Sequence, residues 1–346
     1  MRFDHGGSPS SAIDASVNVN PLGAPVSLDS VFARARGLAQ RYPEPDAGSA
    51  RRAWAQRLGV PVERLLIGNG ASELISLAVR ALAPRRVIVF DPCYSEYEAA
   101  AAAAGCTVEH MALQRENGSW RTPRYLPATC KDDLVVVAQP NNPTGHFTPR
   151  DHLLSMAAGG CNLMVDESFL ALSADPLHGS TLSAESLVPD ARGSVCVIAS
   201  LTKTYCVPGL RLGYVVADER WIGRMSDLRE PWSVNGIAAE AAVSLATDQE
   251  HVERSRTLIA TERRRLARGL ARIPGLYVME GRAPWVLAEL PEPFTAAAVC
   301  SSLLGRGIAI RDASTFRGLG ERWIRVGVRT PDENSKVAEV LAVLLS

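Results

Sequence analysis

Residues 200–214 read SLTKTYCVPGLRLGY, and they follow an apolar run, VCVIA at residues 195–199, that predicts a buried strand. The chain has three lysines against 34 arginines, and one of the three is Lys203. An amine can lose its proton and attack a carbonyl, which a guanidinium cannot do. With the hydroxyls of Ser200 and Thr202 and the guanidinium of Arg211, Lys203 suits a ligand that carries a carbonyl and a phosphate. From spacing alone, a solvated lysine at a strand end is the alternative.

The same pattern, an apolar run that ends in polar residues, recurs upstream. The runs are LLI at 65–67 before GNGASE, RVIVF at 86–90 before DPCY, LVVVA at 134–138 before QPNNPTG, and NLMV at 162–165 before DESF. In an open parallel sheet the carboxyl ends of the strands share one edge, where ligands bind. We therefore expect one cleft to collect Ser72, Tyr94, Asn142, Asp166, Lys203 and Arg211. Singly, Ser72 and Asp166 also suit helix caps, Asn142 a turn and Tyr94 a core position.

The pattern along the 346 residues predicts an α/β fold with a mostly parallel central sheet, helices on both faces, and a smaller α+β domain at the C-terminal end. Residues 1–24 have little periodicity and are expected to form an arm, and a helix is expected over 27–40. We expect three parts: an N-terminal arm and helix over 1–40, packed with the small domain, a large ligand-binding domain over 41–236, and a linking helix with the small domain over 237–346. The helical pattern from Ile237 to about Ile273, with a break near Gln249, predicts the link.

Composition argues against several classes of protein. The net charge is zero, which disfavours electrostatic binding of nucleic acid or an anionic membrane. No uncharged apolar run approaches the roughly 18 residues that span a bilayer. Seven scattered cysteines, an odd number without a Cys-x-x-Cys pair, indicate reduced thiols and a cytoplasmic protein. No metal site is expected.

An aromatic aldehyde with a ring nitrogen and a phosphate matches the predicted cleft. Lys203 would bond to the aldehyde carbon, Asp166 would keep the ring nitrogen protonated, and Tyr94 would stack on the ring. Asn142 would donate a hydrogen bond to a ring oxygen. The phosphate would be held at a helix start by Gly70, Ala71 and Ser72, and by Ser200, Thr202 and Arg211. These groups form a complete site for pyridoxal 5'-phosphate.

The sequence also resembles the fold-type I pyridoxal phosphate enzymes of the class I/II aminotransferase group. The resemblance covers nearly the whole chain, and it lies in NNPTG at 141–145, DE at 166–167, SLTK at 200–203 and GLRLGY at 209–214. Within the group, the chain is most similar to the threonine-phosphate decarboxylases of cobalamin biosynthesis, through HGG at 5–7, NVNPLG at 18–23, RYP at 41–43, GNG at 68–70 and PWSVN at 231–235. Histidinol-phosphate aminotransferases share the core motifs and Tyr42.

The resemblance implies a homodimer and a set of substrate-binding residues. Arg325 would clamp the substrate carboxylate, with Asn18 near it. Arg311, His5 and Tyr42 would meet the substrate phosphate, Tyr42 reaching in from the second subunit. Both arginines also suit ordinary strand surface positions. Phe169 stands where many aminotransferases place a tyrosine that binds the cofactor oxygen, which favours the decarboxylase.

The implied reaction is decarboxylation of L-threonine O-3-phosphate to (R)-1-amino-2-propanol O-2-phosphate. The alternative is transamination of histidinol phosphate, or of a related phosphorylated amine, with 2-oxoglutarate. A non-catalytic pyridoxal-binding regulator is a third possibility. Such regulators usually carry a fused DNA-binding domain, for which this chain is too short and too neutral.

Overall fold

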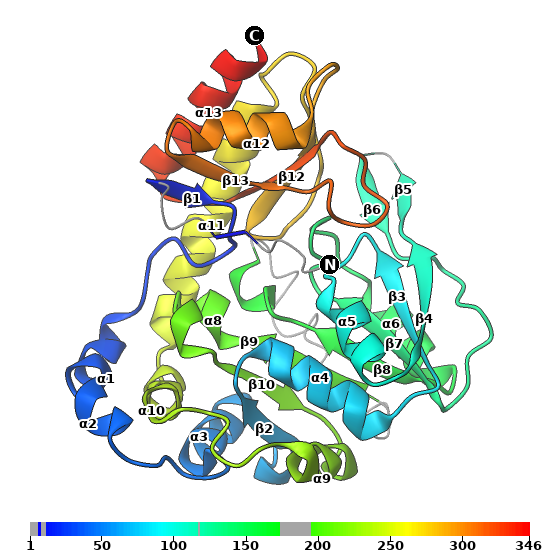
Figure 1. Cartoon of the computed structure of the whole chain (residues 1–346), viewed down its shortest axis with the longest axis vertical. Helices are drawn as coiled ribbons and strands as arrows, with labels where there is room; N and C mark the ends of the chain where they lie inside the picture. Colours follow the sequence, from blue (N-terminus) through cyan, green and yellow to red (C-terminus); the bar gives the residue numbers. More distant parts are fainter. Residues whose placement is uncertain (1–5, 8–11, 117, 174–194) are drawn as a thin grey trace.

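A seven-stranded sheet forms the centre of the larger part of the fold (Figure 1). The computed structural model describes residues 6–7, 12–116, 118–173 and 195–346. In spatial order the strands are β2 (Leu65–Gly68), β10 (Gly213–Val216), β9 (Val195–Ser200), β8 (Asn162–Asp166), β7 (Asp133–Ala138), β3 (Arg86–Asp91) and β4 (Thr107–Ala112). Only β10 runs antiparallel to its neighbours among these strands, so the predicted mostly parallel sheet is confirmed.

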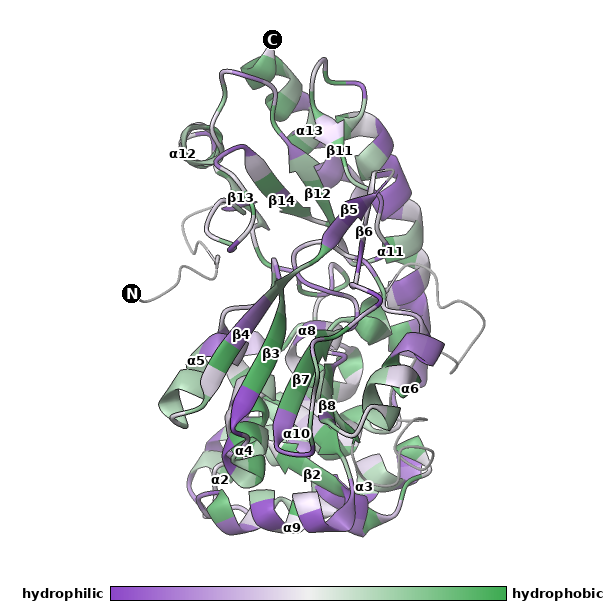
Figure 2. Cartoon of the chain, turned by 90° about the vertical axis from the view of Figure 1, so that its right-hand side faces the viewer, coloured by the Kyte–Doolittle hydropathy of each residue, from purple (hydrophilic) through white to green (hydrophobic). Residues whose placement is uncertain are grey.

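Helices cover both faces of this sheet because alternate strand residues point to opposite sides. Val87 and Val89 pack into a core with α4 (Ala71–Leu82), α5 (Glu96–Ala103) and α9 (Glu219–Leu228). Ile88 and Phe90 pack into the other core with α3 (Gly48–Leu58), α6 (Arg150–Ala158) and α10 (Gly236–Leu245). In Figure 2, β3 and β7 are apolar along most of their length and hydrophilic only at charged ends, which reflects burial on both sides.

A five-stranded sheet lies beyond the first (Figures 1 and 2). Its order is β1 (Ile13–Ala15), β13 (Ile308–Asp312), β14 (Trp323–Gly327), β12 (Trp285–Glu289) and β11 (Tyr277–Val278). It packs against α12 (Ala296–Leu304), α13 (Pro331–Leu345) and the C-terminal half of α11 (Gln249–Leu270), which share a third apolar core. The long helix α11 joins the two parts, and the side chain of Asp248 caps its first turn.

The N-terminal segment differs from the sequence prediction in two ways. The predicted arm contains strand β1, which pairs parallel with β13. A strand of three residues is too short to show a periodic pattern in the sequence. Strand β1 is therefore recognised only from its pairing with β13. The predicted helix over 27–40 is divided into η1 (Val26–Leu28), α1 (Asp29–Ala33) and α2 (Ala35–Ala39), because the backbone of Arg34 (φ −96°, ψ 2°) leaves the helical region.

Short elements complete the fold. They are the hairpin strands β5 (Gln114–Glu116) and β6 (Ser119–Arg121), the helix α8 (Leu201–Thr204), and the 3-10 helices η2 (Val62–Arg64), η3 (Leu170–Leu172) and η6 (Pro208–Leu210). Within the ranges that the structure describes, no helix has the length and apolar character needed to cross a bilayer.

Candidate active site

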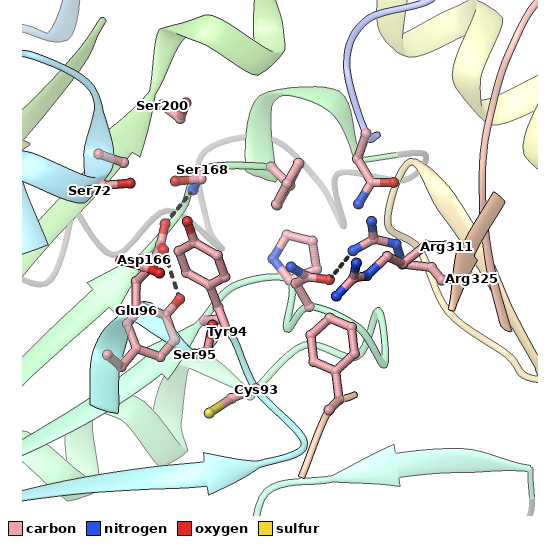
Figure 3. A pocket seen from close by; sticks show the side chains of 18 of the residues that line it. Ser72, Cys93, Tyr94, Ser95, Glu96, Asp166, Ser168, Ser200, Arg311 and Arg325 are labelled. Carbon is pink, nitrogen blue, oxygen red and sulfur yellow. Dashed lines mark hydrogen bonds between the residues drawn. The ribbon is translucent and has the colours of Figure 1, made fainter. Parts of the chain in front are cut away.

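A cavity of about 750 Å³ lies between the carboxyl edge of the large sheet and the small sheet. Polar residues that follow the parallel strands β2, β3, β7, β8 and β9 come together there, as expected for an open α/β sheet. The predicted residues that line it are Asn18, Ala71, Ser72, Tyr94, Asn142, Asp166, Ser200, Thr202, Lys203, Arg211, Arg311 and Arg325. Residues that are far apart in the sequence therefore share one space, and Figure 3 shows several of them converging.

Lys203 lies on α8, immediately after β9. Burial first, and then the positive charges of Arg211 and Arg325, together lower the pKa of its amine to about 8, against the opposing effect of Asp166. Within the described residues, no carboxylate lies within ion-pair distance of Nζ. The two other lysines, Lys131 and Lys336, are exposed. Lys203 is therefore the lysine whose amine can be neutral near physiological pH.

Asp166 ends β8 and is 7% exposed. One carboxylate oxygen accepts a hydrogen bond from the backbone N–H of Ser168 at 2.9 Å, and the other accepts one from the hydroxyl of Tyr97 at 2.7 Å (Figure 3). Burial raises the pKa of Asp166, and the bonds from Ser168 and Tyr97 oppose that rise. A buried carboxylate that faces a cavity is well placed to hold a cationic group.

The start of α4 forms a corner with Arg211. Gly70 has φ +82°, and a Cβ at this position would lie 2.7 Å from Nη2 of Arg211. The guanidinium of Arg211 therefore lies against Gly70, immediately before the start of α4. The hydroxyls of Ser200 and Thr202 lie 2.7 Å apart on the same side. N–H groups, hydroxyls and a guanidinium are the groups that proteins use to bind a phosphate monoester.

Tyr94 follows β3 and lines the cavity (Figure 3). Burial raises the pKa of its phenol, while a hydrogen bond with Ser72 opposes the rise. Its ring contacts Tyr97 edge to face, with 5.7 Å between centroids. The phenol therefore stays protonated and its ring is held in place by a second buried aromatic ring.

Two buried arginines lie side by side on the wall formed by the small sheet. Arg311 on β13 pairs with Arg325 on β14, and they are 5% and 4% exposed. Arg325 donates to Oδ1 of Asn142 at 2.5 Å and to the carbonyl oxygen of Ser16 at 2.8 Å, while its buried Nε has no hydrogen-bond partner. No carboxylate pairs with Arg325 among the described residues. This wall therefore suits an anionic ligand.

Among the residues that the structure describes, two of the predicted site residues, Gly70 and Tyr42, are not part of this lining. Gly70 lies behind it, in contact with Arg211. Tyr42 is 85% exposed, lies outside the cavity and contacts Trp232, with 5.2 Å between ring centroids. His5 lies outside the described residues.

Two further residues contact the predicted site residues and were not predicted from the sequence. Tyr97 is fully buried beside Asp166, and its position three residues after Tyr94 was the available signal, since a buried tyrosine hydroxyl needs a partner. Trp285 lies under the guanidinium of Arg325, 5.6 Å from Cζ to the ring centroid, and its Nε1 donates to the carbonyl oxygen of Pro143 at 2.7 Å. No pattern in the sequence around Trp285 indicates its contact with Arg325. Phe169 packs edge to face on Trp285.

Known proteins resemble the whole of this chain. The family described as aminotransferase class I and II matches residues 11–341. A threonine-phosphate decarboxylase of Salmonella typhimurium is 33% identical over 98% of this chain and 93% of its own length. A histidinol-phosphate aminotransferase of Desulfitobacterium hafniense is 29% identical over 95% of this chain and 90% of its own length.

Solved structures agree. The L-threonine-O-3-phosphate decarboxylase of Porphyromonas gingivalis superposes with a TM-score of 0.85, with 24% identity over 96% of this chain and 99% of that one. This likeness concerns the fold. From the match of the family over residues 11–341 we conclude that the chain belongs to the aminotransferase class I and II family.

Proposed function

We propose that this chain is a pyridoxal-phosphate-dependent lyase that decarboxylates L-threonine O-3-phosphate to (R)-1-amino-2-propanol O-2-phosphate, a step of cobalamin biosynthesis. The proposal rests on one observation above all, the pair of buried arginines Arg311 and Arg325 on the cavity wall. They suit a substrate with two anionic groups, a carboxylate and a phosphate. The similarity to a threonine-phosphate decarboxylase over 98% of the chain supports the same substrate.

The cavity fits pyridoxal 5'-phosphate. Gly70 and Arg211 leave no room for a side chain at the start of α4, which keeps the N–H groups there open to a phosphate. The buried Asp166 needs a cationic partner, which a protonated ring nitrogen provides. Lys203 would hold the aldehyde carbon, Tyr94 would cover the ring, and Asn142 would bind a ring oxygen. When bound, the group supplies an electron sink for the carbon that carries the substrate amine.

The protein's residues would select the bond that breaks. Arg325 would hold the carboxylate in a bidentate manner and Arg311 the phosphate, so the substrate is fixed at two ends. Fixing both ends sets which bond at the amine-bearing carbon is exposed to electron withdrawal. When CO₂ leaves, that carbon needs a proton, and the Lys203 amine, with a pKa of about 8, can carry it.

Transamination of histidinol phosphate is the second candidate. It is favoured by the 29% identity to a histidinol-phosphate aminotransferase over 95% of the chain. The same cavity residues would serve both reactions, since breaking a Cα–H bond instead of the Cα–carboxylate bond requires only a rotation of the substrate. Phe169, in place of a tyrosine beside the cofactor, weighs against it.

Product analysis decides between the two. With pyridoxal phosphate bound, the protein should release CO₂ from L-threonine O-3-phosphate without added keto acid. Lys203→Ala should lower this rate by several orders of magnitude and abolish the near-visible absorption of the lysine-bound cofactor. Lys336→Ala, which removes an exposed lysine, is the matched control and should retain both. A requirement for 2-oxoglutarate would overturn the decarboxylase and favour the aminotransferase.

We also propose a homodimer in which Tyr42 completes the site of the partner subunit. Tyr42 is 85% exposed, although it is aromatic, and it lies outside the cavity of its own chain. Trp232 beside it is 47% exposed, and Val26 and Phe32 of the N-terminal segment are also exposed. Exposed aromatic and apolar side chains of this kind are typical of subunit interfaces.

The cysteines support a reducing compartment, and we propose the cytoplasm. All seven lie in described residues, and each is a free thiol. Five of them have a pKa raised mainly by burial and lie partly or fully inside the fold: Cys93, Cys106, Cys161, Cys196 and Cys206.

A further inference from the structure

Asn20 connects the N-terminal segment to the turn that carries Lys203. Its side chain and backbone are 1% exposed. The backbone N–H of Asn20 donates to the carbonyl oxygen of Lys203 at 3.0 Å, and its Nδ2 donates to the carbonyl oxygen of Thr204 at 2.7 Å. A residue 184 positions away in the sequence therefore binds the last carbonyls of α8.

The helix α8 needs such a partner. It has four residues, far fewer than an isolated helix requires, and the last carbonyls of any helix lack donors from within it. Local bonds hold its first residues, from the N–H of Tyr205 to Leu201 at 3.1 Å and from that of Val207 to Thr202 at 3.0 Å. The local bond to the Lys203 carbonyl, from Cys206, is longer, at 3.4 Å. Asn20 thus supplies the shorter bond at the lysine itself.

Asn20 is in turn fixed by the long helix α11. Its Nδ2 lies 2.6 Å from Oγ of Ser255 and 3.1 Å from Nε2 of His251. Because Ser255 uses its hydroxyl hydrogen to donate to the carbonyl oxygen of His251, its oxygen accepts from Asn20. The side-chain oxygen of Asn20 accepts from the N–H of Leu22 at 3.0 Å. Every polar atom of this buried amide therefore has a partner, which allows one orientation only.

We propose that Asn20 is a positioning residue for Lys203: its side chain binds the carbonyl of Thr204 and Ser255, which holds its backbone N–H against the carbonyl of Lys203 and fixes the direction in which the lysine side chain enters the cavity. The inference rests on the proposed function, because it takes Lys203 as the residue that bonds to pyridoxal phosphate. Asn20 does not line the cavity, so it acts through the lysine and not on the ligand. Through Ser255 it also ties the lysine to α11, the helix that packs against the small sheet with Arg311 and Arg325.

The burial of the Lys203 amine agrees with a positioning role for Asn20. Its low pKa of about 8 is due first to burial, then to Arg211 and Arg325. A turn released from Asn20 would let the side chain move toward water, where these effects weaken. The chemical state of the lysine therefore depends on the position of a backbone turn that Asn20 holds.

Two variants and a matched control test the proposal. Asn20→Ala removes all side-chain bonds, whereas Asn20→Asp keeps the acceptor for the N–H of Leu22 but loses the donors to Thr204 and Ser255. The control is Asn334→Ala. Asn334 is 2% exposed, and its Nδ2 also donates twice, to Glu262 at 3.0 Å and to the carbonyl oxygen of Arg329 at 2.8 Å, but it lies on α13. It matches Asn20 in burial and in lost bonds.

The readouts are the visible circular dichroism of the bound pyridoxal phosphate and the rate at which the holoenzyme loses it. Both Asn20 variants should change the dichroism band, which reports how the ring is oriented, and should lose the cofactor about 10- to 100-fold faster. Asn334→Ala should lower the melting temperature to a similar extent and leave both readouts at the wild-type values. Ser255→Ala, which removes one of the two contacts of Asn20 with α11, should give a smaller change in the same direction, and it replaces the Asn20 variants if these do not fold.

Two results would overturn the inference. One is wild-type dichroism and cofactor retention in Asn20→Asp, and the other is an equal change in Asn334→Ala. The proposed function is tested separately, by borohydride reduction of the wild-type holoenzyme followed by mass analysis. Absence of pyridoxyl label on Lys203 would overturn the proposed function, whereas a labelled wild type with unaffected Asn20 variants would overturn this inference alone.

Discussion

Lys203 combines a reactive group with surroundings that favour its neutral form. Burial is the larger effect on its pKa, and Arg211 and Arg325 add to it, while Asp166 acts in the opposite direction. A lysine that follows a buried strand could be singled out from the sequence, because lysine is rare in this chain. The strand-end pattern also placed Asp166 and Arg211 in the same cleft, whereas Arg325, more than a hundred positions away, was indicated only by the family resemblance.

The pH dependence of cofactor binding follows from this pKa. Only the neutral amine attacks a carbonyl, so the rate at which the apoprotein reacts with pyridoxal phosphate should rise with pH, reach half its maximum near pH 8, and then level off. Arg325→Gln removes a positive charge, which should raise the pKa of the amine and move the curve to higher pH. Arg325→Lys keeps the charge and should move it less. Stopped-flow absorbance measures the rate, and a wild-type rate that still increases at about pH 10, near the ordinary lysine pKa, would contradict the assignment.

The start of α4 shows how one element depends on another. Gly70 can adopt φ +82° because it has no Cβ, and this lets the helix begin against Arg211. Gly213 on β10 is packed as closely, since a Cβ there would lie 2.9 Å from the backbone nitrogen of Ala71. The loop, the helix and the antiparallel strand therefore form the corner together.

Substitution of Gly70 should weaken cofactor binding more than it weakens the fold. Gly70→Ala forces a side chain into an unfavourable backbone region and toward Arg211, whereas Gly59→Ala has a similar φ of +69° with no atom within 4 Å of the new Cβ. Both should destabilise the protein by about 1–3 kcal/mol. Equilibrium titration with pyridoxal phosphate should show weaker binding in Gly70→Ala and wild-type binding in Gly59→Ala. Equal affinities in the two variants would remove this corner from the cofactor site.

At the scale of the whole molecule, the two sheets provide opposite walls of the cavity. The large sheet contributes Asp166 and Lys203 at its carboxyl edge, and the small sheet contributes Arg311 and Arg325. The N-terminal segment joins them, because β1 belongs to the small sheet while Asn20 binds α8. Tyr42 stays outside this cavity, and the proposed dimer gives it a role in the site of the partner subunit.

Hybrid dimers test that role. Lys203→Ala and Tyr42→Ala should each be impaired as homodimers. When they are mixed and allowed to exchange subunits, one site of each hybrid combines an intact Lys203 with an intact Tyr42 from the other chain, so activity should rise above that of either parent. A mixture of Tyr42→Ala with the double variant contains no intact site and serves as the control. Equal activity in the two mixtures would show that Tyr42 acts within its own chain or not at all.

The sequence by itself determined the residue types and their order along the chain. An apolar run that ends in polar residues is a pattern of consecutive residues, so it can be recognised without the fold. Such runs predicted the parallel strands and the residues at their ends, from Ser72 to Arg211. It did not predict β1 or the break at Arg34, because these depend on pairing and backbone geometry that no periodic pattern records.

The tertiary structure alone decided the partners. Tyr97 bonds to Asp166, Trp285 lies under Arg325, and Asn20 holds Lys203, although the members of each pair are 69, 40 and more than 180 positions apart. Such pairs form only when the sheets and helices pack, since burial obliges each polar group to find a donor or acceptor wherever the fold brings one. The residues around Lys203 thus define the chemistry, and the packing of distant segments fixes where its amine lies.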